Sequence, residues 1–177
     1  MRLRAGAMLA VVLAGLAVTA VGAAAAEEPQ WRAVTTEDKA VTAEFPGEAT
    51  YTANQLRSGQ GFPYLMHQHA AEFDGRAFIV QTAVYPKDVY VNTPQANLQG
   101  GLDAAAKSMD GGKWTSIAWT RHQGLIASDA IGQRGGLEVR TMSVLKGQRI
   151  VTVTYAGPPE TAKSAEVERF FKSLKIQ

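Results

Sequence analysis

The sequence predicts an α+β fold in which helices pack on an antiparallel sheet. Runs of four to ten residues, rich in β-branched and aromatic types, occur in both halves of the chain and are joined by short turns. A helical pattern separates the two groups, and a second one ends the chain with Val167, Phe170, Phe171 and Leu174 at positions i, i+3, i+4 and i+7. Consecutive hairpins make a sheet antiparallel, and the apolar stripe on the last helix needs such a sheet to cover.

The first half of the folded part is expected to be made of strands. Val41, Ala43 and Phe45 alternate with polar residues, as in a strand with one buried face. Residues 50–61 are polar and contain glycine, which indicates a loop or an irregular strand. The other strands are predicted at 31–36, 40–45, 64–73 and 77–85, with Asp74-Gly75 as a hairpin turn.

A central helix follows. Thr93 is expected to cap it and Pro94 suits its first turn. Gly100-Gly101 weakens the helix by about 1 kcal/mol per glycine and indicates a kink or a close approach to the sheet. We expect Asp110-Gly111-Gly112 to end it. The residues of its apolar face are Leu98, Leu102, Ala105 or Ala106, and Met109.

Four strands joined by short turns are predicted in the second half, followed by the last helix. Gly135-Gly136 suits a primed two-residue hairpin turn. The strands are expected at 114–121, 125–134, 137–145 and 149–155, and the helix at 160–173.

The first 26 residues resemble a secretory signal peptide. Arg2 and Arg4 form a basic start, residues 5–21 are apolar, and Ala24-Ala25-Ala26 fits a signal peptidase site. We expect cleavage after Ala26, export to the periplasm, and one folded domain at 27–177 without a membrane span. The alternative is an uncleaved N-terminal anchor; periplasmic and fully secreted locations are not distinguished.

Charge and cysteine content exclude several classes of function. The 18 Lys and Arg residues fall to 16 when Arg2 and Arg4 are removed, which equals the 16 Asp and Glu residues. Without a basic stripe, the chain is not expected to bind nucleic acid. The chain has no cysteine, which excludes thiol nucleophiles, disulfides and thiolate metal sites.

Two motifs of this chain are similar to motifs that recur in small exported bacterial proteins with a PsbP-like fold. One is the step Phe45-Pro46-Gly47 after an N-terminal hairpin, and the other is the closing helix Glu168-Arg169-Phe170-Phe171-Lys172-Ser173-Leu174-Lys175. The resemblance implies an α/β/α sandwich over nearly all of 27–177. Related families use this fold for binding, as photosystem extrinsic subunits and as a nuclear GTPase-binding protein. No binding residue of either group matches this chain, so the resemblance implies a fold and a non-enzymatic module.

His67 and His69 are the candidate metal ligands. At positions i and i+2 of a strand they point to the same face, where His122, Glu72 or Asp74 could complete a metal site. The other interpretation is a pair of half-exposed polar side chains. Two histidines without a third ligand at a characteristic spacing favour this second interpretation.

A hydrolytic site is the weakest of the candidate sites. Ser128, Asp129 and His122 have the residue types of a triad, but no G-x-S-x-G motif is present. Asp129 lies in the apolar run 126–131, so an ion pair with Arg140 across the Gly135-Gly136 hairpin is preferred. No glycine-rich segment precedes a helix in the way that phosphate binding requires.

Aromatic residues offer possible contact surfaces. Trp114 and Trp119 are five positions apart and would face opposite sides of one strand, so one is expected in the core. The connector with Val89, Tyr90 and Val91, together with Tyr85, is the predicted exposed contact patch.

The sequence therefore predicts an exported, non-catalytic binding or accessory module whose partner is a protein or a small ligand. A periplasmic metal-binding protein using His67 and His69 is the alternative, and a hydrolase with an unrecognised site is the second alternative. No cofactor is predicted. The sequence indicates neither the identity of the partner, nor the pathway, nor the oligomeric state.

Overall fold

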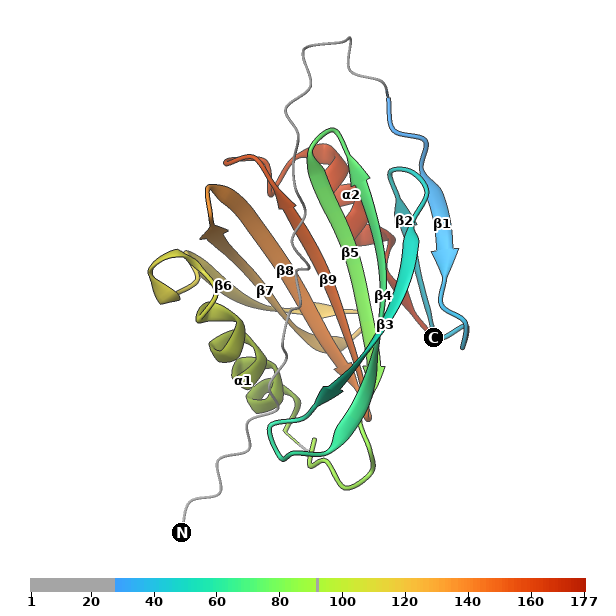
Figure 1. The fold of residues 1–177 in the computed structure, drawn as a ribbon, viewed down its shortest axis with the longest axis vertical. Coiled ribbons are helices and arrows are strands. Elements are labelled where there is room, and N and C mark those ends of the chain that lie inside the picture. The colour runs from blue at the N-terminus through green and yellow to red at the C-terminus, as the bar shows by residue number, and fades with distance from the viewer. Residues whose placement is uncertain (1–27, 92) are drawn as a thin grey trace.

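The computed structural model describes residues 28–91 and 93–177, so the predicted signal peptide lies outside the described residues. Ten strands and two α-helices make up this part (Figure 1). The strands are β1 (Arg32–Thr35), β2 (Val41–Phe45), β3 (Thr50–Arg57), β4 (Pro63–Phe73), β5 (Arg76–Val84), β6 (Ser116–His122), β7 (Leu125–Arg134), β8 (Leu137–Lys146), β9 (Arg149–Gly157) and β10 (Lys175–Ile176). The helices are α1 (Pro94–Ala106) and α2 (Ala165–Ser173), with a short 3-10 turn at Asp110–Gly112.

Seven strands form one antiparallel main sheet in the order β3-β4-β5-β9-β8-β7-β6. Strands that are neighbours in the sequence pair with each other from β3 to β5 and from β6 to β9. The pairing of β9 with β5 then joins the two halves of the chain in one sheet. The turns at Asp74-Gly75 and Gly135-Gly136 have positive φ at both residues, as primed hairpin turns require. In the described part of the chain, β3 and β6 are the edges of this sheet.

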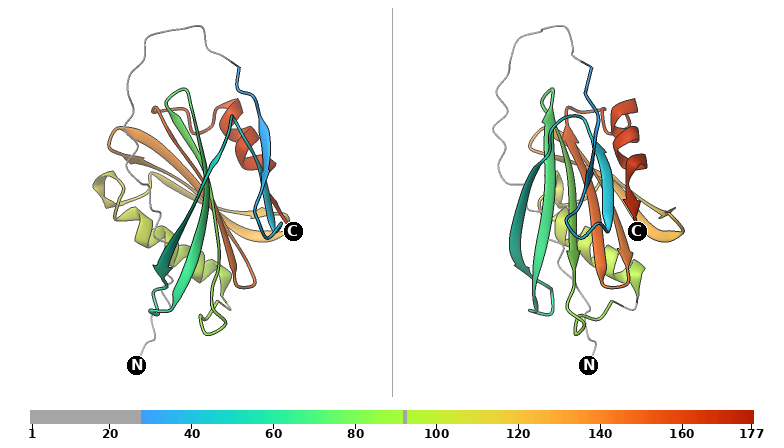
Figure 2. Two further views of the ribbon diagram at one scale, coloured as in Figure 1. Left: turned by 45° about the vertical axis from the view of Figure 1, so that its right-hand side comes forward. Right: turned by 90° about the vertical axis from the view of Figure 1, so that its right-hand side faces the viewer.

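A second, three-stranded sheet has the order β1-β2-β10. Its last strand pairs Lys175 with Thr42 and Ile176 with Val41, so the end of the chain completes the first hairpin. This small sheet lies beside α2 (Figure 2), and Phe45 of β2 packs against Phe170 of α2 with ring centroids 5.3 Å apart.

The main sheet is covered on both faces, which gives an α/β/α sandwich. On what we call the α2 face, the helix and the small sheet bury one continuous cluster that includes Phe78, Val153, Tyr155 and Phe170. On the opposite α1 face, two separate apolar clusters are present, one around Leu98 and one around Leu102. The alternation of strand residues decides which face each side chain joins.

The α+β class, the antiparallel sheet and the α/β/α sandwich are confirmed. Within the segment 50–61, for which the sequence predicts a loop or an irregular strand, residues 50–57 form the regular strand β3. The last helix begins at Ala165 instead of residue 160, because Ser164 caps it by accepting a hydrogen bond from the Val167 amide. The predicted Thr93 cap is wrong: its side chain makes no capping hydrogen bond.

The first strand of the second half begins at Ser116, and Trp114 precedes it. The Trp114 indole nitrogen donates to the Leu102 carbonyl of α1 at 2.9 Å. A side chain on Gly132 of β7 would collide with the Trp114 ring, so glycine is needed there. In the described residues, no helix is both long and apolar enough to cross a membrane.

Candidate functional site

The two candidate histidines lie on β4, and both face the α2 side of the main sheet. The strand alternates, with His69 opposite Val80 of β5, and Val80 belongs to the core of that face. His69 is buried and His67 is half-buried. The predicted shared face is therefore present, because the spacing i, i+2 on a strand requires it.

A tyrosine on the neighbouring strand, which the sequence analysis did not connect to this pair, contacts both imidazoles. Tyr51 on β3 stands opposite His69 in the sheet register. Its ring stacks on His67 with centroids 6.0 Å apart and is tilted against His69 at 5.2 Å. The Tyr51 hydroxyl and His67 Nδ1 share a hydrogen bond of 2.7 Å. An ion that used His67 Nδ1 as a ligand would have to displace this hydrogen bond.

Burial sets the protonation of His69. Desolvation lowers its pKa below the ordinary value of 6.5, and the nearby His67 lowers it further. The carboxylate of Glu37, 3.7 Å from His69 Nε2, opposes this effect without reversing it. His69 is therefore neutral at pH 7.

The further ligands suggested by the sequence do not join the pair. Glu72 belongs to the other face of β4, since it differs from His69 by an odd number of positions. Asp74 pairs with Arg76 at 3.1 Å, and His122 on β6 bonds to the Leu174 carbonyl through Nε2 at 2.9 Å. Among the described residues, no group of three His, Asp or Glu side chains is placed to hold a metal ion.

Metal binding at His67 and His69 stays a prediction, and calorimetry with zinc and copper tests it. If the pair binds an ion, His67→Ala abolishes tight binding, and Tyr51→Ala strengthens it because the hydrogen bond that occupies His67 Nδ1 is removed. Unchanged affinity in His67→Ala would contradict the metal alternative.

The three residues of the possible triad do not meet. Ser128 and Asp129 are consecutive on β7, so their side chains point to opposite faces of the sheet. Ser128 is fully buried on the α1 face, and its Oγ has no hydrogen-bond partner among the described residues. The His122 side chain is hydrogen-bonded to the Leu174 carbonyl. The hypothesis that Ser128, Asp129 and His122 form a catalytic triad is therefore wrong.

Asp129 instead forms the predicted ion pair with Arg140 of β8. Arg140 Nη2 lies 2.8 Å from Asp129 Oδ2, and Nε donates to Oδ1 at 3.0 Å. Its Nη1 reaches Glu168 of α2 at 2.6 Å, and the guanidinium lies 4.4 Å from the centre of the Phe171 ring. This network fastens α2 to the sheet.

An exposed apolar patch lies on the α2 face, away from the part that α2 and the small sheet cover. Tyr51 and Leu65 are each 46% exposed and Val84 is 52% exposed. They come from the neighbouring strands β3, β4 and β5. We call Tyr51, Leu65 and Val84 the β3–β5 patch.

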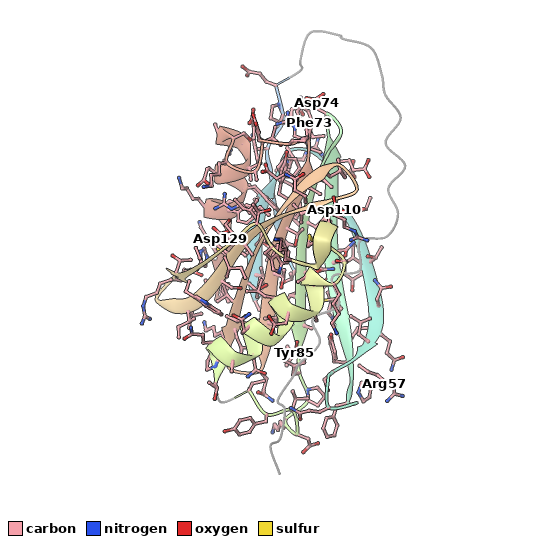
Figure 3. The ribbon with its side chains drawn as sticks, turned by 90° about the vertical axis from the view of Figure 1, so that its left-hand side faces the viewer. Arg57, Phe73, Asp74, Tyr85, Asp110 and Asp129 are labelled. Carbon is pink, nitrogen blue, oxygen red and sulfur yellow. The ribbon has the colours of Figure 1, made fainter. Side chains whose placement is uncertain are left out.

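Leu65 and Val84 lie side by side near one end of the sheet, and Tyr51 lies farther along its free edge, opposite His69. Figure 3 places Arg57, at the end of β3, and Tyr85, which follows Val84, at the same end of the molecule, opposite to Phe73 and Asp74. All eight residues of β3 pair in unbroken register with β4, and seven of the eight are exposed. β3 has no proline or bulge, and its single charged residue is Arg57.

The contact patch predicted around Tyr85 and Val89–Val91 is mostly wrong. Tyr85 and Val89 are buried in the core on the α1 face, and their side chains pack with Leu98. Only Tyr90 of that connector is well exposed. The sequence prediction for the tryptophans was better, since Trp114 is buried and Trp119 is partly exposed.

Comparison with solved structures matches this chain to the solution structure of cyanobacterial PsbP (CyanoP) from Synechocystis sp. PCC 6803. The TM-score is 0.53 with 6% sequence identity, over 89% of this chain and 98% of that one. The chain has a PsbP-like fold. At such low identity this similarity establishes the fold alone. No model of a protein family and no curated protein matches the sequence.

Proposed function

We propose that the protein is an exported, non-catalytic binding or accessory module that docks a protein partner on the β3–β5 patch. The observation that carries this proposal is the exposure of Tyr51, Leu65 and Val84 together on one face of three adjacent strands. Leu65 and Val84 are neighbours across β4 and β5, and Tyr51 exposes its ring on the adjacent edge strand. Exposed apolar side chains gathered on one face are a signature of interaction sites. The signal-peptide pattern in residues 1–26 supports export.

The partner proposed here presents an extended segment that adds to the free edge of β3. Natural sheet edges are usually protected by charges, proline or bulges, and β3 has little of this protection. Strand addition satisfies the unpaired backbone groups of the edge, and the neighbouring side chains give specificity. A segment beside β3 would bring alternate apolar side chains against Tyr51.

Site-specific photocrosslinking in cells tests the proposal. A benzophenone amino acid replaces Tyr51 or Leu65 in the patch, and Tyr90 or Trp119 at exposed positions outside it. We expect one discrete adduct from the two patch positions and none from Tyr90 and Trp119. An adduct confined to Trp119 would place the partner at the β6 edge and contradict the proposal.

A charge substitution makes this test specific. With the crosslinker at Tyr51, Val84→Asp should remove the adduct, because a carboxylate would be buried in the apolar interface. The matched control Tyr90→Asp should leave it unchanged. Both positions are more than half exposed, so neither change should alter the melting temperature.

A further inference from the structure

A row of polar side chains crosses the α1 face of the main sheet. The register places Gln68 opposite Gln81, and Gln81 opposite Thr152. The row continues through Ser143 to Ser128, across five neighbouring strands from β4 to β7. We call these five residues the polar belt. Their alignment comes from strand pairing, since they are far apart in the sequence.

The polar belt lies inside the molecule and divides the core of this face. Gln81 is 2% exposed and Ser128 is fully buried. On one side of the belt, Met66, Ala83, Ile150 and Leu145 pack with Leu98 of α1. On the other side, Ile79 and Ala130 pack with Leu102 of α1. Leu98 and Leu102 of α1 therefore fall on opposite sides of the belt, and Gly100 and Gly101, which have no side chains, lie between them in the helix.

Two atoms of the belt lack the hydrogen bonds that burial normally demands. Gln81 Nε2 donates to Gln68 Oε1 at 2.8 Å, and the hydroxyls of Ser143 and Thr152 bond to each other at 3.0 Å. Gln81 Oε1 and Ser128 Oγ have no partner among the described residues. A buried polar group without a partner is costly, and one in a native protein calls for an explanation.

We propose that the polar belt binds a small neutral molecule with two hydrogen-bonding groups joined by an apolar chain. One hydroxyl of the ligand donates to Gln81 Oε1, and the other exchanges a hydrogen bond with Ser128 Oγ. The two side chains stand on β5 and β7, three strand spacings apart, which is about 14 Å between backbones. The Gln81 amide is turned toward Gln68 on β4, so the ligand must cross this whole distance.

The chemistry of the belt selects a neutral ligand. Its five residues carry only amide and hydroxyl groups, so no opposite charge is present to balance an ion. Burying an unpaired charge costs far more than one hydrogen bond returns. The apolar residues on either side of the belt suit the alkyl part of the molecule.

A matched series of probes tests this site on the purified protein by calorimetry. The probes are 1,8-octanediol, 1-octanol and octanedioate, which share a chain length and differ in their end groups. We expect the diol to bind roughly threefold to tenfold more tightly than the mono-alcohol, the effect of one neutral hydrogen bond. The doubly charged octanedioate should not bind.

Two conservative variants locate the probe. Ser128→Ala and Gln81→Leu should each reduce the affinity for the diol to that of 1-octanol and leave the affinity for 1-octanol within about threefold. Ser116→Ala, which removes an exposed hydroxyl on β6, is the matched control and should bind the diol as the unchanged protein does.

The unchanged protein alone can overturn the proposal, whatever the variants do. If none of the three probes binds, an ordered water fills the hydrogen-bonding capacity of the belt, and the proposal is wrong. If octanedioate binds as tightly as the diol, the class of ligand is wrong. Equal diol affinity in Ser128→Ala, with the fold intact, would remove Ser128 from the site.

Discussion

The two faces of the main sheet are built differently. The α2 face has one continuous core with interlocking aromatic rings, in which Phe78 packs edge-on against both Tyr155 and Phe170. The α1 face has two smaller clusters with the polar belt between them. The α2 face is also closed by the ion pairs of Arg140. We infer that the α2 face supplies most of the stability, while the α1 face retains unsatisfied polar groups that a ligand can use.

The largest expected effect is the loss of an aromatic ring from the α2 face. Phe170→Ala should lower the free energy of unfolding by about 4 kcal/mol, because Phe170 is fully buried and touches several rings. Leu98→Ala on the α1 face should cost less, about 2–3 kcal/mol. Urea denaturation measures both. A larger loss in Leu98→Ala would reverse the comparison.

Removal of Arg140 should have the next largest effect. Arg140→Met leaves Asp129 without its cation and Glu168 with only Lys172, 3.4 Å away, and should cost about 2–3 kcal/mol at pH 7. The hydrogen bond from Arg140 lowers the pKa of Glu168 below 4.5. This stabilisation is present above pH 4.5 and is lost as the pH falls through the folded pKa. The stability difference between the two proteins should therefore shrink in acid. A difference that does not change with pH would contradict this origin.

A pair of serines one strand apart tests the polar belt. Ser143→Ala breaks the hydrogen bond to Thr152 and should cost about 1 kcal/mol. Ser128→Ala removes a hydroxyl without a partner and should cost nothing or raise stability slightly. Thermal unfolding compares them directly. An equal loss in both variants would mean that Ser128 is satisfied in solution.

The smallest effect concerns His69. Burial lowers its pKa in the folded state, so the unfolded chain binds a proton more readily below pH 6.5. Stability should be complete above that pH and should fall slightly as the solution is acidified through 6.5. His69→Gln should remove this slope, and urea midpoints measured between pH 5 and 7.5 would show it. A slope that persists in the variant would assign it to another group.

The sequence predicted β5 from its run of β-branched and aromatic residues, and α2 from its apolar stripe at helical spacing. It left β3 open because both faces of this edge strand are exposed, so residues such as Thr50 and Asn54 show no apolar alternation. It found the shared face of His67 and His69 but not Tyr51, which only the pairing of β3 with β4 brings into contact with them.

The polar belt could not be predicted for a related reason. In the sequence, Ser143 and Thr152 are each one polar residue within a strand whose other residues are largely apolar. Their alignment with Gln81 depends on β9 pairing with β5, and the sequence does not contain the order of the strands in an explicit form. The pair Asp129 and Arg140 was predictable because the two residues share one face of a short hairpin and are diagonal neighbours, two positions out of direct register.

The pairing of Ile176 with Val41 also delays completion of the small sheet until the end of the chain has been synthesised. The first hairpin emerges early from the ribosome, but its third strand arrives 135 residues later. Contacts between residues so distant in sequence form slowly, since a long loop must close first. Val41, Ala43 and Phe45 therefore stay exposed through most of synthesis. The small sheet can therefore close only after almost the whole chain has been synthesised.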